Sequence, residues 1–280
     1  MRHGQAAAAY AVEPANGGLR IVAASEILLA MASGGLIGIV LGLIGGGGSI
    51  LAVPLLVYVV GVGSIHAAIG TAAVAVTANA LAGLLGYARA GMVKWPCAFV
   101  FAAAGVVGAA VGAEIGKSVD GTHLLMLFGL LMIGVGLSML RKRRREADPD
   151  VRLSRTTAAV LVPRLVPMGT GVGLAAGFFG IGGGFLIVPA LIAATAMPFT
   201  YAIGTSLVVV AALGATTAAS YTLSGHVDWP LTALLVIGGV AGAEMGVFLG
   251  RRLASHKALF ERAFAVLVIA IGVYVAIGTT

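Results

Sequence analysis

Two glycine runs interrupt apolar stretches of this chain, and each is followed a few residues later by a proline. The first is the Gly-Gly-Gly-Gly-Ser sequence at 45–49, before Pro54, and the second is Gly-Ile-Gly-Gly-Gly at 180–184, before Pro189. Glycine is costly to order, and broken backbone within a lipid bilayer is tolerated only where it is buried in protein or lines a cavity. The two runs therefore predict helices that break inside a membrane, at a cavity or a binding site.

The composition agrees with a membrane location. Of the 280 residues, 60% are hydrophobic and 10% are charged, and the mean hydropathy is +1.08. Abundant glycine and scarce aromatic residues favour helices packed through small residues over a barrel of alternating strands. We therefore predict an all-α, polytopic membrane protein. Cys97 is the single cysteine, so no intramolecular disulfide can form.

Apolar segments fall into two sets of five. Most approach the ~20 residues that a helix needs to cross a bilayer, but the second of each set is much shorter and is predicted to be a half-helix or a re-entrant segment. The segments are 26–44, 49–62, 65–88, 94–117 and 121–140, then 163–180, 184–197, 199–223, 229–250 and 259–278. The predicted organisation is an N-terminal tail at 1–25, a first transmembrane repeat at 26–140, a linker at 141–162 and a second repeat at 163–280.

The second set repeats the first. Around the glycine runs, Gly42, Gly45, Gly47, Gly48, Leu51, Val53, Pro54 and Leu56 match Gly177, Gly180, Gly182, Gly183, Leu186, Val188, Pro189 and Leu191. The Ala-Ile-Gly-Thr sequence at 68–71 recurs at 202–205, and Trp95-Pro96 recurs at 229–230. A single one-residue gap is enough to align most of the two sets.

Charge predicts that the two repeats are inverted in the membrane. Eight of the 17 Lys and Arg residues lie at 141–164, which marks a cytoplasmic linker and not a nucleic-acid site. The 89–94 loop carries two basic residues and its counterpart at 224–228 carries none. The next loops reverse this bias, with one basic residue at 117–120 and three at 251–257. Both termini are predicted on the outer side of an inner membrane.

The chemistry of the broken helices favours a small anion. The first N–H groups of a helix lack intrahelical partners and lie at its positive end, so two helix starts facing each other would make a concave anion site. Ser49 is expected to cap its half-helix. The predicted substrate site comprises Gly45, Gly46, Gly47, Gly48, Ser49, Thr71, Asn79, Gly180, Gly182, Gly183, Gly184 and Thr205.

Structural alternatives remain for each of these groups. Glycines also permit close helix crossings, which is the interpretation we favour for Gly105, Gly108 and Gly112. A threonine hydroxyl such as that of Thr71 can bond its own helix backbone, and Asn79 can link helices.

Glu114 and Glu244 are the intramembrane carboxylates, and proton coupling is one hypothesis for them. Glu114 is close enough to Lys117 for an ion pair at the membrane interface, which is the alternative. His66 and His123 lie near segment ends and are interpreted as interfacial residues. No metal-ligand spacing and no nucleotide phosphate loop occurs in the sequence, so no cofactor and no ATP-driven step are predicted.

At these residues the chain resembles the TauE/SafE family, also described as probable sulfite exporters. The resemblance depends on 45–49 and 180–184 with their Val-Pro pairs and on Ile-Gly-Thr at 69–71 and 203–205, and it extends from about 26 to 278. It implies an inner-membrane secondary transporter for sulfite, sulfoacetate or other small sulfur-containing or organic anions. Ile181 interrupts the second run, so the two half-sites need not bind equally.

The predicted function is alternating-access transport of a small anion through the bilayer. Export can be driven by the membrane potential alone, whereas uptake needs a proton or sodium ion as the coupling ion. The alternatives are an anion channel, a membrane-embedded enzyme and a non-transporting subunit or sensor. A homo-oligomer is compatible with the sequence.

Overall fold

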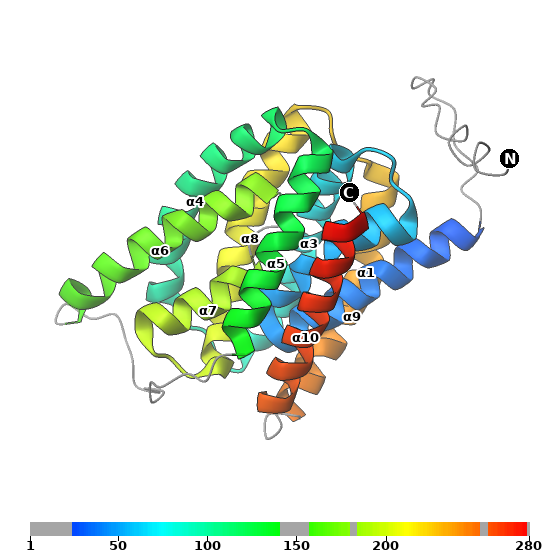
Figure 1. The fold of residues 1–280 in the computed structure, drawn as a ribbon. Coiled ribbons are helices and arrows are strands. Elements are labelled where there is room, and N and C mark those ends of the chain that lie inside the picture. Colours follow the sequence, from blue (N-terminus) through cyan, green and yellow to red (C-terminus); the bar gives the residue numbers. More distant parts are fainter. Residues whose placement is uncertain (1–23, 141–156, 180–183, 253–256, 279–280) are drawn as a thin grey trace, which may run out of the picture.

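The computed structural model describes residues 24–140, 157–179, 184–252 and 257–278, and these are mostly helical. The predicted linker and most of the predicted tail lie outside the described residues. The first half contains α1 (Ala24–Ile44), η1 (Gly45–Leu51), α2 (Ala52–Pro54), η2 (Leu55–Val60), α3 (Ile65–Arg89), α4 (Trp95–Ser118) and α5 (Gly121–Leu140). The second half contains α6 (Ala158–Phe179), α7 (Gly184–Thr195), α8 (Phe199–Leu223), α9 (Trp229–Arg252) and α10 (Lys257–Gly278) (Figure 1).

The described part of the chain contains seven helical stretches that are long and apolar enough to cross a membrane. They are Ile27–Val60, Ile65–Arg89, Trp95–Ser118, Gly121–Leu140, Ala158–Phe179, Phe199–Leu223 and Trp229–Gly250. α7 and the apolar part of α10, Ala265–Ile277, are shorter. The predicted all-α membrane fold is confirmed, whereas the orientation of the two halves in the membrane stays a prediction.

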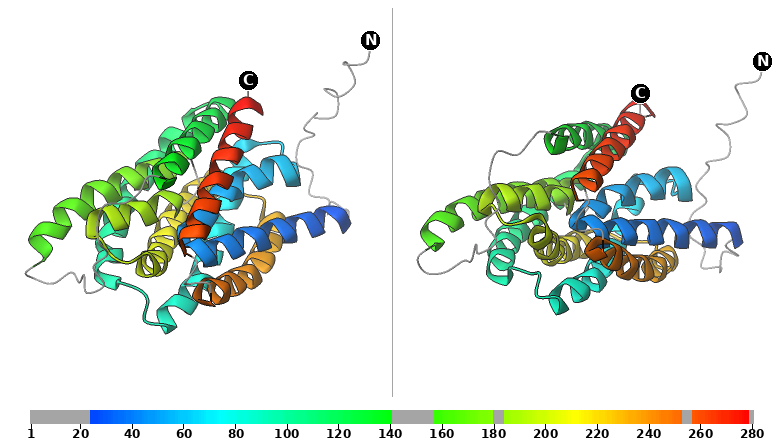
Figure 2. Two further views of the ribbon diagram at one scale, coloured as in Figure 1. Left: turned by 60° about the horizontal axis from the view of Figure 1, so that its bottom comes forward. Right: turned by 90° about the horizontal axis from the view of Figure 1, so that it is seen from below.

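The first short segment turns back on α1. Gly45 has a φ of +76°, which side chains rarely adopt, and it reverses the chain at the end of α1. After the turn Gly48 packs on the backbone of Leu41 and Ile37, so α1 and the η1–η2 segment form a helical hairpin (Figure 2). The segment was predicted to begin at residue 49. Instead η1 begins at Gly45, directly after α1, so the whole glycine run is helical. Every residue of η1 is buried.

The two halves make the same helix contacts with their partners exchanged. α1 packs along α9 and α4 packs along α6, while α3 packs on α8 and α5 on α10. α3 and α8 are the most buried of the membrane-spanning helices and form the centre of the molecule. α5 and α10 lie side by side at the periphery of the bundle (Figures 1 and 2). Equivalent helices of the two halves therefore make equivalent contacts.

Glycines bring the paired helices into backbone contact. At these positions a Cβ atom would overlap backbone of the opposite helix or approach it closely. The glycines are Gly34, Gly38 and Gly42 of α1 against α9, and Gly169, Gly173 and Gly177 of α6 against α4. The predicted packing role of Gly105, Gly108 and Gly112 is confirmed, because each packs against α6. In lipid, such small-residue contacts are a main source of helix association.

Two glycines of α6 test this packing directly. A Cβ on Gly173 would overlap the backbone of Gly105, whereas a Cβ on Gly171 would meet no heavy atom within 4 Å. We expect Gly173→Val to destabilise the purified protein by about 1–3 kcal/mol or more, as overpacking does. Thermal unfolding in detergent measures this effect. Gly171→Val is the control, and an equal loss in both variants would contradict the packing role of Gly173.

Candidate functional site

Gly46 of η1 and Gly184, the first residue of α7, are called the two hairpin tips here, and they meet in the interior of the protein. A Cβ on Gly46 would overlap the backbone of Gly184, and a Cβ on Gly184 would overlap that of Gly46. Gly45 and Gly47 are buried beside them. The structure therefore brings the start of the first short segment against the start of the second. Gly180, Gly182 and Gly183 were predicted for the same site and lie outside the described residues.

Ser206 of α8 holds the first tip. Its Oγ accepts a hydrogen bond from the Gly46 N–H at 3.2 Å and donates one to the Ile203 carbonyl at 2.7 Å. Both residues are buried. An anion that uses the Gly46 N–H must therefore displace the Ser206 hydroxyl. The sequence analysis missed Ser206, since its repeat counterpart is Ala72 and the repeat gives it no partner.

Ser49 does not cap its half-helix, and this prediction was wrong. Because η1 already begins at Gly45, Ser49 lies inside it and donates its hydroxyl to the Gly46 carbonyl at 2.9 Å. Ile44 occupies the N-cap position and makes no side-chain cap hydrogen bond. Ser49 thereby stabilises the tip internally and remains adjacent to the contact between the two hairpins.

Thr71 and Thr205 connect the two halves at opposite ends of the α3–α8 pair. The Thr71 Oγ1 accepts from the Asp228 backbone N–H at 3.0 Å, and the Thr205 Oγ1 accepts from the Lys94 N–H at 3.0 Å. The acceptor hydroxyls are fully buried. Each threonine thus holds the loop of the opposite half, and neither of these bonds reaches a glycine run.

The loops at these two ends have the same geometry. Gly91 and Gly225 both have positive φ, and the chain turns back so that the Met92 N–H bonds the Tyr87 carbonyl at 3.0 Å. The equivalent His226 N–H bonds the Tyr221 carbonyl at 2.9 Å. The two loops differ in charge, because Lys94 of one stands where the other has Asp228.

Asn79 is fully buried at the crossing of α3 and α9, where its amide packs on Gly239. Its side-chain nitrogen and oxygen have no hydrogen-bond partner among the described residues. The counterpart Leu213 packs in the same way on Gly105. Asn79 is therefore a polar group unique to the first half, and its predicted part in substrate binding stays a prediction.

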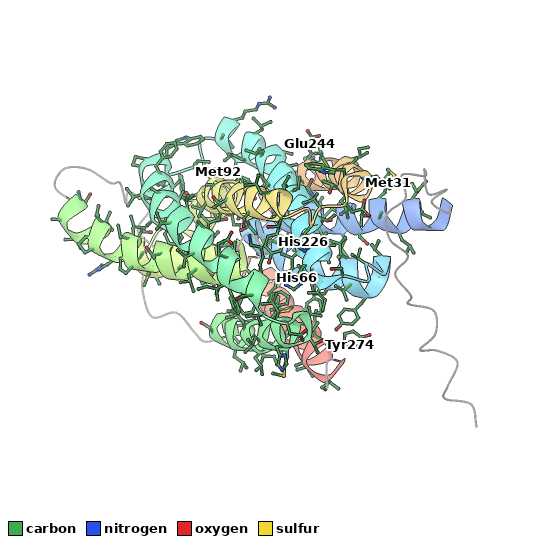
Figure 3. The ribbon with its side chains drawn as sticks, turned by 90° about the horizontal axis from the view of Figure 1, so that it is seen from above. Met31, His66, Met92, His226, Glu244 and Tyr274 are labelled. Carbon is green, nitrogen blue, oxygen red and sulfur yellow. The ribbon has the colours of Figure 1, made fainter. Side chains whose placement is uncertain are left out.

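The two predicted coupling carboxylates lie on outer helix faces. Glu114 is exposed, pairs with Lys117 at 2.7 Å and accepts from the Ser220 hydroxyl at 2.9 Å. The predicted ion pair with Lys117 is confirmed, and its place at the membrane interface stays a prediction. Glu244 is exposed on α9 (Figure 3). Both side chains lie outside the buried hairpin tips, and a coupling role for them stays a prediction.

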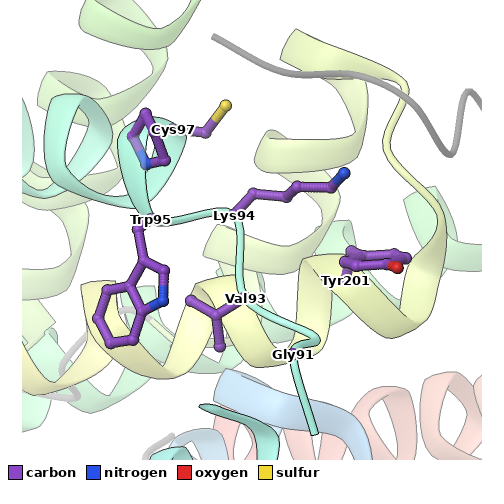
Figure 4. A pocket seen from close by; sticks show the side chains of 7 residues that line it. Gly91, Val93, Lys94, Trp95, Cys97 and Tyr201 are labelled. Carbon is purple, nitrogen blue, oxygen red and sulfur yellow. The ribbon is translucent and has the colours of Figure 1, made fainter.

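A cavity with a volume of about 370 Å³ opens beside the loop that Thr205 holds. It is lined by Gly91, Val93, Lys94, Trp95, Pro96, Cys97 and Tyr201 (Figure 4). The Lys94 ammonium lies 4.5 Å from the centre of the Tyr201 ring, a cation–π distance. Lys94 is also the residue that precedes α4, so its charge adds to the positive end of that helix. The cavity is therefore suited to an anion. The sequence analysis used Lys94 only as one of the loop charges that predict how the first half is oriented in the membrane.

Buried glycine crossings, hairpin tips that meet and apolar helices of membrane-spanning length define a multi-pass membrane protein built from two equivalent halves. The profile of a family described as sulfite exporter TauE/SafE matches residues 30–275. A "Probable membrane transporter protein" of Xylella fastidiosa (strain 9a5c) is 48% identical over 89% of this chain and 95% of its own length. The "Probable membrane transporter protein YunE" of Bacillus subtilis is 28% identical, over 75% of this chain and 84% of its own.

The chain belongs to the TauE/SafE family, and its relatives carry the names of probable membrane transporters. This confirms the family resemblance deduced from the two glycine motifs. No solved structure matches the fold.

The threonine contacts between the halves can be tested by removing the hydroxyl at constant shape. Thr71→Val and Thr205→Val each leave a backbone N–H of the opposite half without its acceptor, so we expect a loss of about 1–3 kcal/mol in stability. Thermal unfolding measures it. Thr216→Val is the control, because the Thr216 hydroxyl bonds Ala212 of its own helix at 2.9 Å. Equal effects at all three sites would contradict the proposed connection.

Proposed function

We propose that this protein is a secondary transporter of a small anion in the inner membrane, with its two halves inserted in opposite orientations. The observation that carries the proposal is the cavity lined by Lys94, where an ammonium and the positive end of α4 provide for negative charge. Its volume of about 370 Å³ accommodates sulfite, a sulfonate such as sulfoacetate or another small organic anion.

The hairpin tips are the second part of the proposed mechanism. Gly46 and Gly184 are in backbone contact, so the tips close the interior between the two halves in this arrangement. Separation of the tips would release the Gly46 N–H from Ser206 and offer it, with the following N–H groups of η1, to the anion. Alternating access then consists of one half moving against the other about this contact. In this proposal, Gly45–Ser49 and 180–184 form the central site.

On the predicted orientation the Lys94 cavity faces the cytoplasm, as does the basic linker at 141–164, and both termini lie on the outer side. Export of an anion from this cavity is favoured by a membrane potential that is negative inside, by about 2.3 kcal/mol per charge for each 100 mV. The bilayer and the anion are the partners that this function requires.

The anion preference is tested with purified protein in proteoliposomes and a panel of sulfite, sulfoacetate and sulfate. We expect Lys94→Gln to raise the half-saturating anion concentration at least about tenfold, as the loss of a charge-assisted contact of about 1.5–3 kcal/mol does. Arg89→Gln, which removes an exposed charge from the last turn of α3, is the matched control. Equal effects of the two variants would show that only general surface charge matters.

The contact between the hairpin tips predicts a second effect. Gly46→Ala places a methyl group against the Gly184 backbone, and we expect anion counterflow to fall at least about tenfold through strain of about 1–3 kcal/mol. Gly63→Ala is the control, since no atom lies within 4 Å of the added Cβ.

Counterflow also separates the transporter from its rivals. A carrier accelerates flux when substrate is present on the opposite side, whereas an anion channel does not. If the protein were a sensor or a non-transporting subunit, neither the unmodified protein nor Gly46→Ala would show any anion flux.

A further inference from the structure

Three buried polar atoms from the two halves come together without partners. The Nε2 of His66, the Nδ1 of His226 and the Oη of Tyr221 are buried, and none has a hydrogen-bond partner among the described residues. The ring centres of His66 and His226 lie 5.9 Å apart, and those of Tyr221 and His226 lie 6.2 Å apart. Figure 3, which views the molecule from above, shows the two histidines next to each other in that view.

The fold holds these groups in place from both halves. His66 lies in the first turn of α3, and His226 lies in the loop between α8 and α9. The His226 carbonyl packs on Gly70, where a Cβ would overlap it, and its N–H bonds Tyr221 at 2.9 Å. The bond between Thr71 and the Asp228 N–H fixes the same loop to α3. The imidazole pair therefore spans the boundary between the halves.

Polar atoms that are buried without a hydrogen-bond partner destabilise a protein, so such a group calls for a ligand. A neutral imidazole offers one donor and one acceptor nitrogen, and a phenol hydroxyl can donate or accept a hydrogen bond. The described residues provide no group of three or more His, Cys, Asp or Glu side chains that could hold a metal ion. The chemistry that these atoms share is the binding of a proton, with water to complete the hydrogen bonds.

Among the described residues, this group has no equivalent at the other end of the α3–α8 pair. Its repeat counterparts are Thr200, Met92 and Tyr87, and of these Tyr87 donates its hydroxyl to the Gly42 carbonyl at 2.9 Å. The counterpart end instead carries the permanent charge of Lys94 beside its cavity. One end therefore has a fixed positive charge and the other end has two groups whose charge follows pH.

We propose that His66 and His226, supported by Tyr221, form the proton-binding site that couples anion movement to pH. The proton passes from water at this end to the free nitrogen of one imidazole. Because the ring centres lie 5.9 Å apart, a positive charge on one imidazole opposes a positive charge on the other, so the pair is suited to bind a single proton. This proposal rests on the proposed anion transport. A proton carried with a monovalent anion cancels its charge, so the membrane potential no longer opposes uptake.

Other titratable and charged groups lie on the neighbouring elements. Asp228 ends the loop that carries His226. Glu114 and Lys117 of α4 contact Ser220 and Ser224 at the end of α8. Asp120 and His123 lie at the start of α5, where Gly121 packs on Ile65. The hydrogen bond from the Thr122 backbone N–H lowers the pKa of Asp120 below its ordinary value. Asp120 therefore stays ionised near neutral pH and cannot account for a titration there. His123 is exposed and lies 3.4 Å from Asp120, which makes it a suitable control.

The proton site is tested first without transport, by NMR titration of the full-length protein labelled with ¹⁵N-histidine in nanodiscs. We expect His226→Gln to shift the titration midpoint of His66 by about one pH unit, as coupled sites do, and His66→Gln to shift that of His226 likewise. His123→Gln should shift neither. If each histidine titrates independently of the other, the proposed shared site is wrong. Thermal unfolding of each glutamine variant verifies that it is folded.

Anion uptake into proteoliposomes provides the second arm. We expect the rate to be about tenfold higher at about pH 5.5 than at about pH 7.5, because an imidazole binds a proton more readily as the pH falls. His66→Gln and His226→Gln should reduce this ratio to less than about twofold, whereas His123→Gln should retain it. Uptake with an unchanged pH profile in both variants overturns the coupling site and leaves anion transport standing. If the unmodified protein moves no anion, the proposed function fails, and the NMR titration alone decides the proton site.

Discussion

Close backbone contact between the two halves is the interaction on which this structure depends. Lipid tails are as apolar as leucine, so helices in a bilayer gain nothing from burying apolar side chains against each other. Glycine faces on α1 and α6 solve this problem by letting whole helices approach α9 and α4 until their backbones touch. The same solution appears at the hairpin tips, where Gly46 meets Gly184. What holds the halves together is therefore also what positions the centre of the candidate site.

The two ends of the α3–α8 pair share one backbone design and differ in chemistry. Each end has a threonine that accepts a hydrogen bond from the loop of the opposite half, and a tyrosine whose carbonyl closes that loop. On this common frame one loop carries Lys94 and the other carries His226 and Asp228. A repeated fold thus presents a permanent cation at one end and titratable groups at the other, which gives a symmetric scaffold a chemical polarity.

Much of the fold could be predicted because it depends on local patterns. Apolar segments of bilayer length and the recurrence of Gly-x-Gly-Gly with a Val-Pro pair identified the helices, the repeat and the family. The packing of Gly108 and Gly112 on α6 followed from their helical spacing. Ser49 was assigned wrongly, because sequence alone does not reveal that a glycine run coils into a 3₁₀ helix directly after α1.

The site residues that were missed depend on contacts between the halves. Ser206 reaches Gly46 across 160 positions, and Lys94 lines a cavity beside a loop that Thr205 of the other half holds. A repeat alignment draws attention to positions that match, whereas Ser206, Lys94 and His66 all lack a matching counterpart. Their importance comes from the difference between the halves, which a search for similarity overlooks.

The exchange of helix partners has a consequence for how the chain is made. α1 enters the membrane first, but the glycine face of α1 packs on α9, which is synthesised near the end of the chain. Before α9 is present, Gly34, Gly38 and Gly42 lack the helix on which they pack in the folded protein. The packing of the first half is therefore incomplete until the second half is made. Each half therefore supplies a helix that completes the packing of the other half.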